Sequence, residues 1–221
     1  MHAMLRALAF LVALSLISRP VLVELFTSQG CSSCPPADAF LGELAARQDV
    51  VALSFHVDYW NYIGWKDPFA TSWATQRQRE YGRTLGQRYV YTPEIVVDGA
   101  AHAAGSDRDE VERLIAEAEA RPGPVVEAER NADEIRIRIG AGKGEGTVWL
   151  VRFDPEHVTR IERGENGGRT LRNFNVVRGM TKLGTWSGEP LDLRAEPGPV
   201  GCAVIVQDEG SGKVAGAAVV R

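Results

Sequence analysis

Residues 21–36 read VLVELFTSQGCSSCPP, and the rest of the chain is organised around this stretch. An apolar run, Val21–Phe26, leads through a short polar turn to Cys31 and Cys34, and two prolines follow. Proline is tolerated in the first turn of a helix, because the N–H that it lacks would have no intrahelical partner there. We therefore expect a strand, then the cysteine pair, then a helix, with Cys31 just outside the helix N-terminus.

This position favours thiol chemistry. Unpaired N–H groups and the positive end of the helix macrodipole stabilise an anion, so we expect an exposed Cys31 thiolate. Cys34, at the start of the helix, would be close enough to attack a mixed disulfide formed on Cys31. A Cys-x-x-Cys pair alone also occurs in zinc sites and structural disulfides. Its place between a strand and a helix, with Thr92-Pro93 before a later strand, makes the signal more specific.

The bulk composition narrows the function classes. The 221 residues suffice for one large domain or two small ones, and the net charge of −4 gives no electrostatic case for binding nucleic acid or an anionic membrane. Three cysteines are too few for a disulfide scaffold. One close pair and a distant Cys202 are instead typical of a redox pair and a third cysteine that takes no part in its chemistry. Cys202 lies in an Ala/Val-rich run, where a buried inert thiol is expected. We expect no cofactor and no metal.

Residues 1–18 have the order of a signal peptide. Arg6 precedes an apolar run from Ala7 to Ile17, which is shorter than the roughly 20 residues that span a bilayer. Export would place the protein in the periplasm or outside the cell, where the cysteine pair could exist as a disulfide. The alternative is an N-terminal helix or a strand extension of the mature fold. An uncleaved leader would be the only membrane contact that we expect.

Several motifs resemble known families. The Cys-x-x-Cys stretch, together with Thr92-Pro93 and residues 94–99 (EIVVDG), is similar to the thioredoxin fold. Residues 56–60 (HVDYW) and 64–69 (GWKDPF) more closely resemble a family of secreted bacterial thioredoxin-like proteins that is known only as a domain of unknown function. Residues 164–171 (GENGGRTL) and 175–177 (NVV) fit the C-terminal half of that family. The resemblance implies a fold and redox chemistry, but no established substrate.

The resemblance also implies roles for individual residues. Pro93 would follow a cis bond and face the cysteines, and Thr92 would hydrogen-bond the backbone of a partner. Glu24 resembles the buried acid that helps to move the proton of the resolving thiol; a solvent-facing side chain or a salt bridge is the alternative.

His56 is a further candidate from its place at the carboxyl end of the second expected strand, where ligands bind in open α/β sheets. It could lower the pKa of the attacking thiol, or it could pair with Asp58 and only fix the loop.

Residues 59–73 are dense in aromatic side chains. Aromatic clusters are more often core than binding surface. Trp60 and Trp65, however, fall in a loop just beyond a strand end, so we expect at least one of them to line a groove beside the cysteines. Asp67-Pro68 predicts a helix start, with the acid as N-cap and the proline at the first helical position.

The residues Arg121-Pro122-Gly123-Pro124 predict a domain boundary. For residues 19–121 we expect an α/β thioredoxin-like domain. Beyond the boundary, residues 135–139 (IRIRI) alternate with period two, and further short apolar runs are separated by glycine-rich turns. Residues 125–221 therefore predict an all-β domain, an antiparallel sandwich.

The leading functional hypothesis is an exported thiol–disulfide oxidoreductase that acts on protein or small-molecule disulfides. Cys31 would attack and Cys34 would resolve, and the partners would be protein thiols, disulfides or a redox protein. The intervening Ser32-Ser33 does not fix the direction of exchange, which depends on the reduction potential. One alternative is Cu(I) binding by the two cysteines with His56. Another is a permanent structural disulfide in a protein whose β domain binds a partner.

Overall fold

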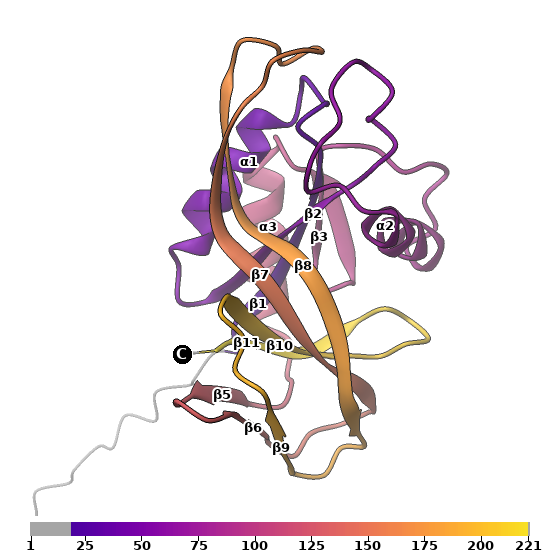
Figure 1. Cartoon of the computed structure of the whole chain (residues 1–221). Coiled ribbons are helices and arrows are strands. Elements are labelled where there is room, and N and C mark those ends of the chain that lie inside the picture. Colours follow the sequence, from indigo (N-terminus) through magenta and orange to yellow (C-terminus); the bar gives the residue numbers. More distant parts are fainter. Residues whose placement is uncertain (1–18, 221) are drawn as a thin grey trace, which may run out of the picture.

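The computed structural model describes residues 19–220, and the expected signal peptide lies outside them. Within this range three helices pack against two β-sheets (Figure 1). In chain order the elements are β1 (Val21–Thr27), α1 (Pro35–Ala45), β2 (Val50–His56), α2 (Ser72–Thr84), β3 (Glu94–Val97), β4 (Ala101–Ala104), α3 (Arg108–Glu119), β5 (Val126–Arg130), β6 (Ile135–Ile139), β7 (Gly146–Arg160), β8 (Thr170–Trp186), β9 (Leu191–Ala195), β10 (Gly201–Gln207) and β11 (Val214–Val219).

The larger sheet is mixed and has eight strands in the order β11-β10-β7-β8-β2-β1-β3-β4. Strand β2 runs parallel to both of its neighbours, β1 and β8, and the other pairs are antiparallel. All seven residues of β1 and of β2 are buried. Continuous apolar runs of this kind are typical of parallel strands that are covered on both faces.

The expected fold, an α/β thioredoxin-like domain followed by a separate antiparallel sandwich, is wrong. Strands β7 and β8 are 15 and 17 residues long and form one hairpin that extends from the three-stranded sheet to the N-terminus of α1 (Figure 1). Because β8 of this hairpin pairs with β2, a single sheet continues across the expected domain boundary. The β5-β6-β9 sheet has only three strands and is not half of a classical two-sheet sandwich.

The junction between β2 and β8 depends on a few contacts. Ser54 and Val176 are the one paired position. The Ser54 hydroxyl donates to the Phe174 carbonyl at 2.9 Å, and the Asn175 amide donates to the Ala52 carbonyl at 2.8 Å. These side chains continue the connection where regular ladder pairing stops.

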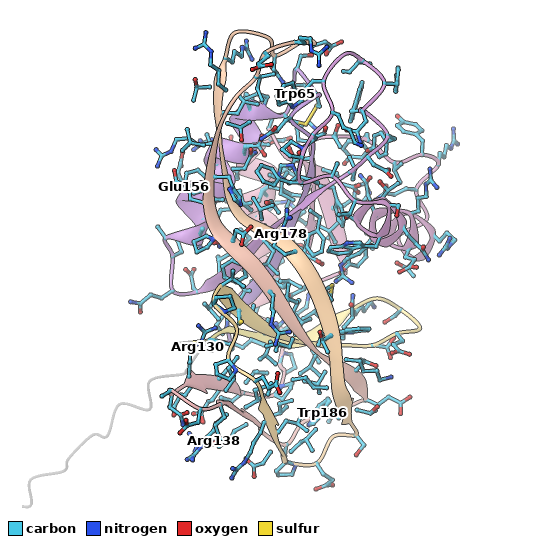
Figure 2. The ribbon with its side chains drawn as sticks, viewed as in Figure 1. Trp65, Arg130, Arg138, Glu156, Arg178 and Trp186 are labelled. Carbon is cyan, nitrogen blue, oxygen red and sulfur yellow. A yellow bond between two sulfur atoms is a disulfide. The ribbon has the colours of Figure 1, made fainter. Side chains whose placement is uncertain are left out.

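Alternate residues of the central strands face different apolar clusters. Val21, Val23 and Leu25 pack beneath α1 and α3, whereas Leu22 and Phe26 pack on the opposite face with Tyr81 of α2. A third cluster fills the space between the two sheets around the fully buried Trp186, the last residue of β8 (Figure 2). No helix within residues 19–220 is both long enough and apolar enough to cross a membrane.

The second helix begins later than Asp67-Pro68 predicts. Helix α2 starts at Ser72, and Thr71 is its N-cap, because the Thr71 hydroxyl accepts from the Ala74 N–H at 3.3 Å. Asp67 is buried in the preceding loop instead, and its carboxylate accepts the backbone N–H groups of Gln29 and Phe69 at 2.8 and 2.9 Å. Asp67 thus bonds Gln29, which is distant in sequence, instead of capping the helix.

Candidate functional site

Cys31 and Cys34 form a disulfide at the N-terminus of α1. Cys34 is the N-cap residue, and the two prolines that follow occupy the first two helical positions. Because these prolines have no N–H, the first helical donors are those of Ala37 and Asp38, which bond the Cys34 carbonyl at 2.9 and 3.0 Å. The expected order of strand, cysteine pair and helix is confirmed.

The loop before β3 faces the disulfide. The Thr92–Pro93 peptide bond is cis, as expected. The Thr92 carbonyl oxygen lies 3.9 Å from Cys31 Sγ, so the two segments meet although 61 residues separate them. The Thr92 hydroxyl accepts the indole N–H of Trp60 at 2.7 Å. Its side chain is therefore already bonded within the protein.

Trp60 and Trp65 each bond a segment that lies next to the cysteine turn. Trp60 bonds Thr92 as described, and the Trp65 indole N–H donates to the Gln29 side-chain carbonyl at 3.1 Å. Both indoles are half-buried. They connect the loop between β2 and α2 to the segments beside the disulfide.

The expectation that Cys31 is exposed is wrong. Cys31 retains 2% of its accessible surface and Cys34 retains none. Asn166, at the tip of the β7–β8 hairpin, is itself buried, and its amide donates to the carbonyls of Gln29 and Cys31 at 2.9 Å each. The hairpin tip therefore covers the cysteine turn, and Ser33 Oγ lies 3.3 Å from Cys31 Sγ.

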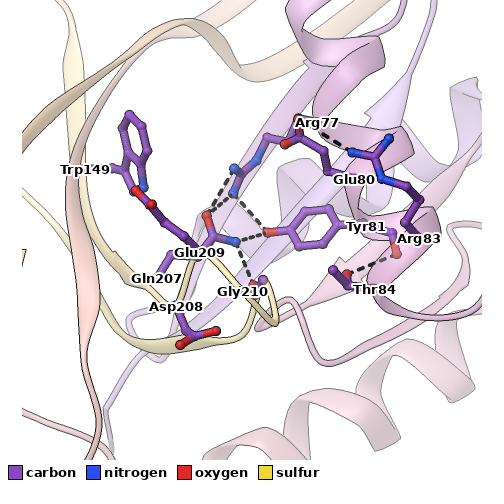
Figure 3. A pocket seen from close by; sticks show the side chains of 11 residues that line it. Arg77, Glu80, Tyr81, Arg83, Thr84, Trp149, Gln207, Asp208, Glu209 and Gly210 are labelled. Atoms are coloured by element: carbon purple, nitrogen blue, oxygen red, sulfur yellow. Dashed lines mark hydrogen bonds and ion pairs between the residues drawn. The ribbon is translucent and has the colours of Figure 1, made fainter.

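Glu24 lies on the wrong face of β1 to serve the cysteines. It is fully buried, and it accepts from Arg77 Nε at 2.7 Å and from the Tyr81 hydroxyl. Gln207 completes this network, because its amide nitrogen donates to Tyr81 Oη at 2.9 Å and its carbonyl oxygen accepts from Arg77. The network borders a cavity of about 490 Å³ next to Trp149 (Figure 3). The salt-bridge alternative for Glu24 is confirmed.

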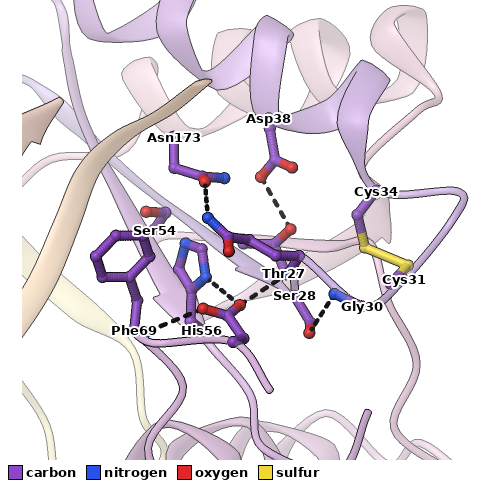
Figure 4. Close-up of polar contacts among 12 residues, drawn as sticks. Thr27, Ser28, Gly30, Cys31, Cys34, Asp38, Ser54, His56, Phe69 and Asn173 are labelled. Atoms are coloured by element: carbon purple, nitrogen blue, oxygen red, sulfur yellow. Dashed lines mark hydrogen bonds and ion pairs between the residues drawn. A yellow bond between two sulfur atoms is a disulfide. The ribbon is translucent and has the colours of Figure 1, made fainter. Parts of the chain in front are cut away.

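A cluster of polar residues lies beneath the first turns of α1 (Figure 4). On this face the apolar residues of β1 and β2 give way to Thr27 and His56 at the strand ends. Thr27 Oγ1 donates to Oδ1 of Asp38, a residue of α1, at 2.9 Å. His56 Nδ1 lies 2.7 Å from Asp67 Oδ2 and so pairs with Asp67, not with Asp58.

Burial sets the charge of this cluster. It raises the pKa of Asp38 from 3.8 to about 7, against the opposing effects of the His56 charge and the Thr27 hydrogen bond. Burial alone would lower the pKa of His56, but the charge and hydrogen bond of Asp67 outweigh it and the pKa is raised. The pKa of Asp67 is lowered despite burial, for the reciprocal reason. His56 and Asp67 thus form an ion pair beside a carboxyl group that titrates near neutrality.

Sequence reasoning missed five residues that build the site: Gln29, Asp38, Asp67, Asn166 and Asn173. Gln29 and Asn173 are buried and bonded to each other, with Gln29 Nε2 donating to Asn173 Oδ1 at 2.9 Å. One of the five carries a local signal. Asp38 is a single acid between the apolar residues Ala37 and Phe40 of the buried helix face, four positions after Cys34.

The Cu(I) alternative has no geometric support. Within residues 19–220, no three His, Cys, Asp or Glu side chains are grouped so that they could hold a metal ion. Cys202 is a free thiol and is buried, as expected, with its sulfur 3.2 Å from Arg130 Nη2.

Comparison with known proteins places the chain in a family. None of the curated proteins matches it. A crystal structure of protein AGR_C_4864 from Agrobacterium tumefaciens is similar at 36% sequence identity and a TM-score of 0.79, with 90% of this chain and 92% of that chain covered. HBP35 of Porphyromonas gingivalis shares the fold at 13% identity and a TM-score of 0.56, over 91% of this chain and 74% of that one. Residues 22–207 match the model of a family of proteins of unknown function (DUF1223), so the chain belongs to that family.

Proposed function

We propose that this protein is an exported, thioredoxin-related thiol–disulfide oxidoreductase of the periplasm or cell exterior, and that Cys31 and Cys34 are its redox pair. The observation that carries the proposal is the contact of the Cys31–Cys34 disulfide, at the N-terminus of α1, with the Thr92 carbonyl 3.9 Å away. The positive end of the α1 macrodipole favours a thiolate at this position. A buried carboxyl group that titrates near neutrality lies on the same helix.

The proposed reaction exchanges one disulfide for another. In the reducing direction, the Cys31 thiolate attacks a partner disulfide, a mixed disulfide forms, and one partner sulfur leaves as a thiolate that takes up a proton. Cys34 then loses its proton and attacks the Cys31 sulfur. The partner's second thiolate leaves and is protonated, so the partner gains two electrons and the Cys31–Cys34 pair loses two. In the oxidising direction the same bonds form and break in reverse.

The burial of Cys31 sets a condition on partners. A disulfide of a folded protein cannot reach the sulfur of Cys31, a residue that retains 2% exposure, unless the covering segments move. The tip around Asn166 and the exposed turn Ser32-Ser33 are the segments that lie over it. A partner would then meet Thr92-Pro93 and the edge of Trp60 beside the sulfur. We therefore propose extended polypeptide segments with thiols or disulfides as partners.

Stopped-flow exchange with a chromogenic aromatic disulfide tests the proposal. The reduced protein should release one equivalent of aromatic thiolate through Cys31 and a second through Cys34, whereas Cys34→Ser should stop after the first and Cys31→Ser should be slow. Cys202→Ala is the control and should react like the parent. A reduced protein whose Cys31 reacts no faster than an ordinary thiol of pKa about 8.5 would contradict the proposal.

A structural disulfide is the second candidate, and the low exposure of both cysteines favours it. Equilibration in glutathione buffers separates the two functions. A reduction potential below about −300 mV, typical of structural disulfides, combined with no exchange with protein disulfides would favour the structural role. A potential within the range of the redox-active pairs, about −270 to −120 mV, would favour the enzyme.

A further inference from the structure

The cavity between α2 and the β10–β11 hairpin lies apart from the disulfide. Its volume is about 490 Å³, and it is bordered by α2, by Trp149 of β7, and by Gln207 with the turn that follows (Figure 3). Tyr81, which lines it, packs on the face of the large sheet opposite α1, the helix that carries the cysteines. A ligand in this cavity would therefore be separated from the cysteine pair by the sheet.

The inner wall of the cavity is polar and fully bonded. Tyr81 retains 2% of its accessible surface and Gln207 retains 7%. The Gln207 carbonyl oxygen accepts from both terminal nitrogens of Arg77 at 3.2 Å, and its amide nitrogen donates to Tyr81 Oη at 2.9 Å. A few polar groups fixed in this way on the wall of a cavity are typical of sites that orient a small ligand.

Two N–H donors of the cavity have no partner among residues 19–220. An arginine side chain has five N–H groups. The Nε of Arg77 donates to Glu24, and its Nη1 donates to Gln207. Its Nη2 donates to both Gln207 and Tyr81, so one N–H of Nη1 is left for a ligand. The indole N–H of Trp149 is the second unused donor.

Trp149 also supplies an aromatic surface. Figure 3 shows its indole at one side of the cavity, with Tyr81 and Thr84 of α2 at the other. The indole is half-buried and is only partly covered by the apolar cluster against which it packs. The face of an aromatic ring is electronegative and attracts hydrogens that carry partial positive charge. The C–H groups of a sugar ring are such hydrogens.

Carboxylate oxygens line the same cavity from the turn at residues 208–212. Asp208 Oδ1 accepts the backbone N–H and the hydroxyl of Ser211. Glu209 Oε1 accepts from Thr147 and Lys182. These bonds lower the pKa of both carboxyl groups, so both are ionised at neutral pH. Within the described residues, the second oxygen of each carboxylate has no partner and remains an acceptor.

The charges of the cavity nearly cancel. Most of the lining ions have an ionic partner: Arg77 with Glu24, Arg83 with Glu80, and Glu209 with Lys182. Asp208 has no such partner in the described part of the chain, so it would repel an anionic ligand, and a cation would lie beside Arg77. An apolar ligand would remove water from the unused donors and acceptors without replacing it. Hydroxyl groups on a neutral ligand satisfy both, because each can donate and accept.

We propose that this cavity binds a neutral sugar ring, which stacks on Trp149 and hydrogen-bonds Arg77 and the carboxylates of the 208–212 turn. The ring can be a free monosaccharide or one unit of a glycan, because the recognised chemistry is the same. The inference goes beyond the proposed redox function and does not depend on it.

An NMR titration of the oxidised protein tests the proposal. The chain has five tryptophans, and the indole N–H resonance that disappears in Trp149→Phe belongs to Trp149. Methyl glucoside, methyl galactoside and N-acetylglucosamine are the monosaccharide probes, and cellotriose and chitotriose are the glycan probes. At least one probe should shift the Trp149 resonance saturably and shift the other four indole resonances less. Tighter binding of a trisaccharide would indicate a glycan, and equal affinities a free sugar. No shift of Trp149 with any probe at about 50 mM, far above millimolar dissociation constants, would overturn the inference.

Trp149→Ala and Trp73→Ala form a matched pair. Trp73 is also half-buried and packs on the same apolar cluster, but it does not line the cavity. Calorimetry with the tightest probe should show an affinity lower by about tenfold or more in Trp149→Ala, which loses a hydrogen bond and the stacking surface. Trp73→Ala should change the affinity less than twofold. If Trp149→Ala does not fold, Trp149→Phe keeps the ring and should lower the affinity about threefold. An unchanged affinity in the folded Trp149 variant would overturn the inference.

Charged sugars test the assigned neutrality of the ligand. Methyl glucuronide and glucosamine should each bind at least about fivefold more weakly than methyl glucoside, because the first places a carboxylate near Asp208 and the second places an ammonium near Arg77. Tighter binding of either charged sugar would overturn the assignment. A protein that exchanges no disulfides yet binds a neutral sugar would refute the proposed redox function and leave this inference standing.

Discussion

Replacing Asp38 with asparagine should make the oxidised protein more stable above neutrality and leave its stability nearly unchanged in acid. Burial raises the pKa of this carboxyl group from 3.8 to about 7. Between these values the folded protein holds a proton that the unfolded chain has lost, so the free energy of unfolding falls as the pH rises. The interval is roughly three pKa units, which at 1.36 kcal/mol per unit gives a cost of up to about 4 kcal/mol above pH 7.

Asparagine removes the charge and keeps most of the packing. Its side chain has the shape of the acid, and its carbonyl oxygen can still accept the Thr27 hydroxyl that now bonds Asp38 Oδ1 at 2.9 Å. We therefore expect a gain of about 2–4 kcal/mol at pH 8 and a difference below about 1 kcal/mol at pH 4, where both side chains are neutral.

Urea unfolding of the oxidised protein, followed by tryptophan fluorescence across this pH range, measures the effect. The control is Asp133→Asn, because Asp133 is exposed in the turn between β5 and β6. Its stability should follow the parent at every pH. A constant offset between Asp38→Asn and the parent, or a loss of stability at high pH, would refute the assigned burial of charge.

Three further predictions concern the surroundings of the site. Arg77→Met should lower the free energy of unfolding by about 3–5 kcal/mol, because Glu24 would remain buried without its cation. Adding Glu24→Gln to this variant should recover part of the lost stability. A further loss in the double variant would contradict the assigned ion pair. Asn166→Ala should lower the free energy of unfolding by about 1–3 kcal/mol, because two hydrogen bonds to the cysteine turn are lost. The same variant should speed reduction of the disulfide by a phosphine, and an unchanged reduction rate would show that the hairpin tip does not limit access. Reducing Cys31–Cys34 should cost about 2 kcal/mol in urea unfolding, because the disulfide closes a very short loop; a much larger loss would indicate that the reduced turn rearranges.

The local features of the cysteine pair could be predicted because their signals lie within a few residues. The apolar run of β1, the two prolines after Cys34 and the helical spacing of α1 each act locally. The long hairpin gave no such signal. Residues 154–160 of β7 are largely exposed or half-exposed, so they lack the apolar alternation that marks a strand. Strand β8 meets β2 at one paired position, a long-range contact that composition does not encode.

The two buried acids of these segments show the same limit of prediction from sequence. Glu24 and Asp38 are both single acids within apolar segments, and the sequence does not say which face of β1 the helix α1 will cover. Alternation along the strand places Glu24 with Leu22 and Phe26, on the face opposite α1. Asp38 is less conspicuous, because acids in the first turn of a helix are ordinary. Only the packing of α1 on β1 and β2 makes Asp38 a buried carboxyl group instead of an exposed capping charge.

The β7–β8 hairpin also determines whether the two halves of the chain can be used separately. A fragment ending at residue 121 would keep Cys31, Cys34 and Thr92, yet it would lose Asn166 and the strand that borders β2. The exposed edge of β2 would then be free to pair with other chains and aggregate. Gene fusions, truncations and chimaeras that contain only the cysteine-bearing half should therefore fail to fold, and the C-terminal half must be kept with it.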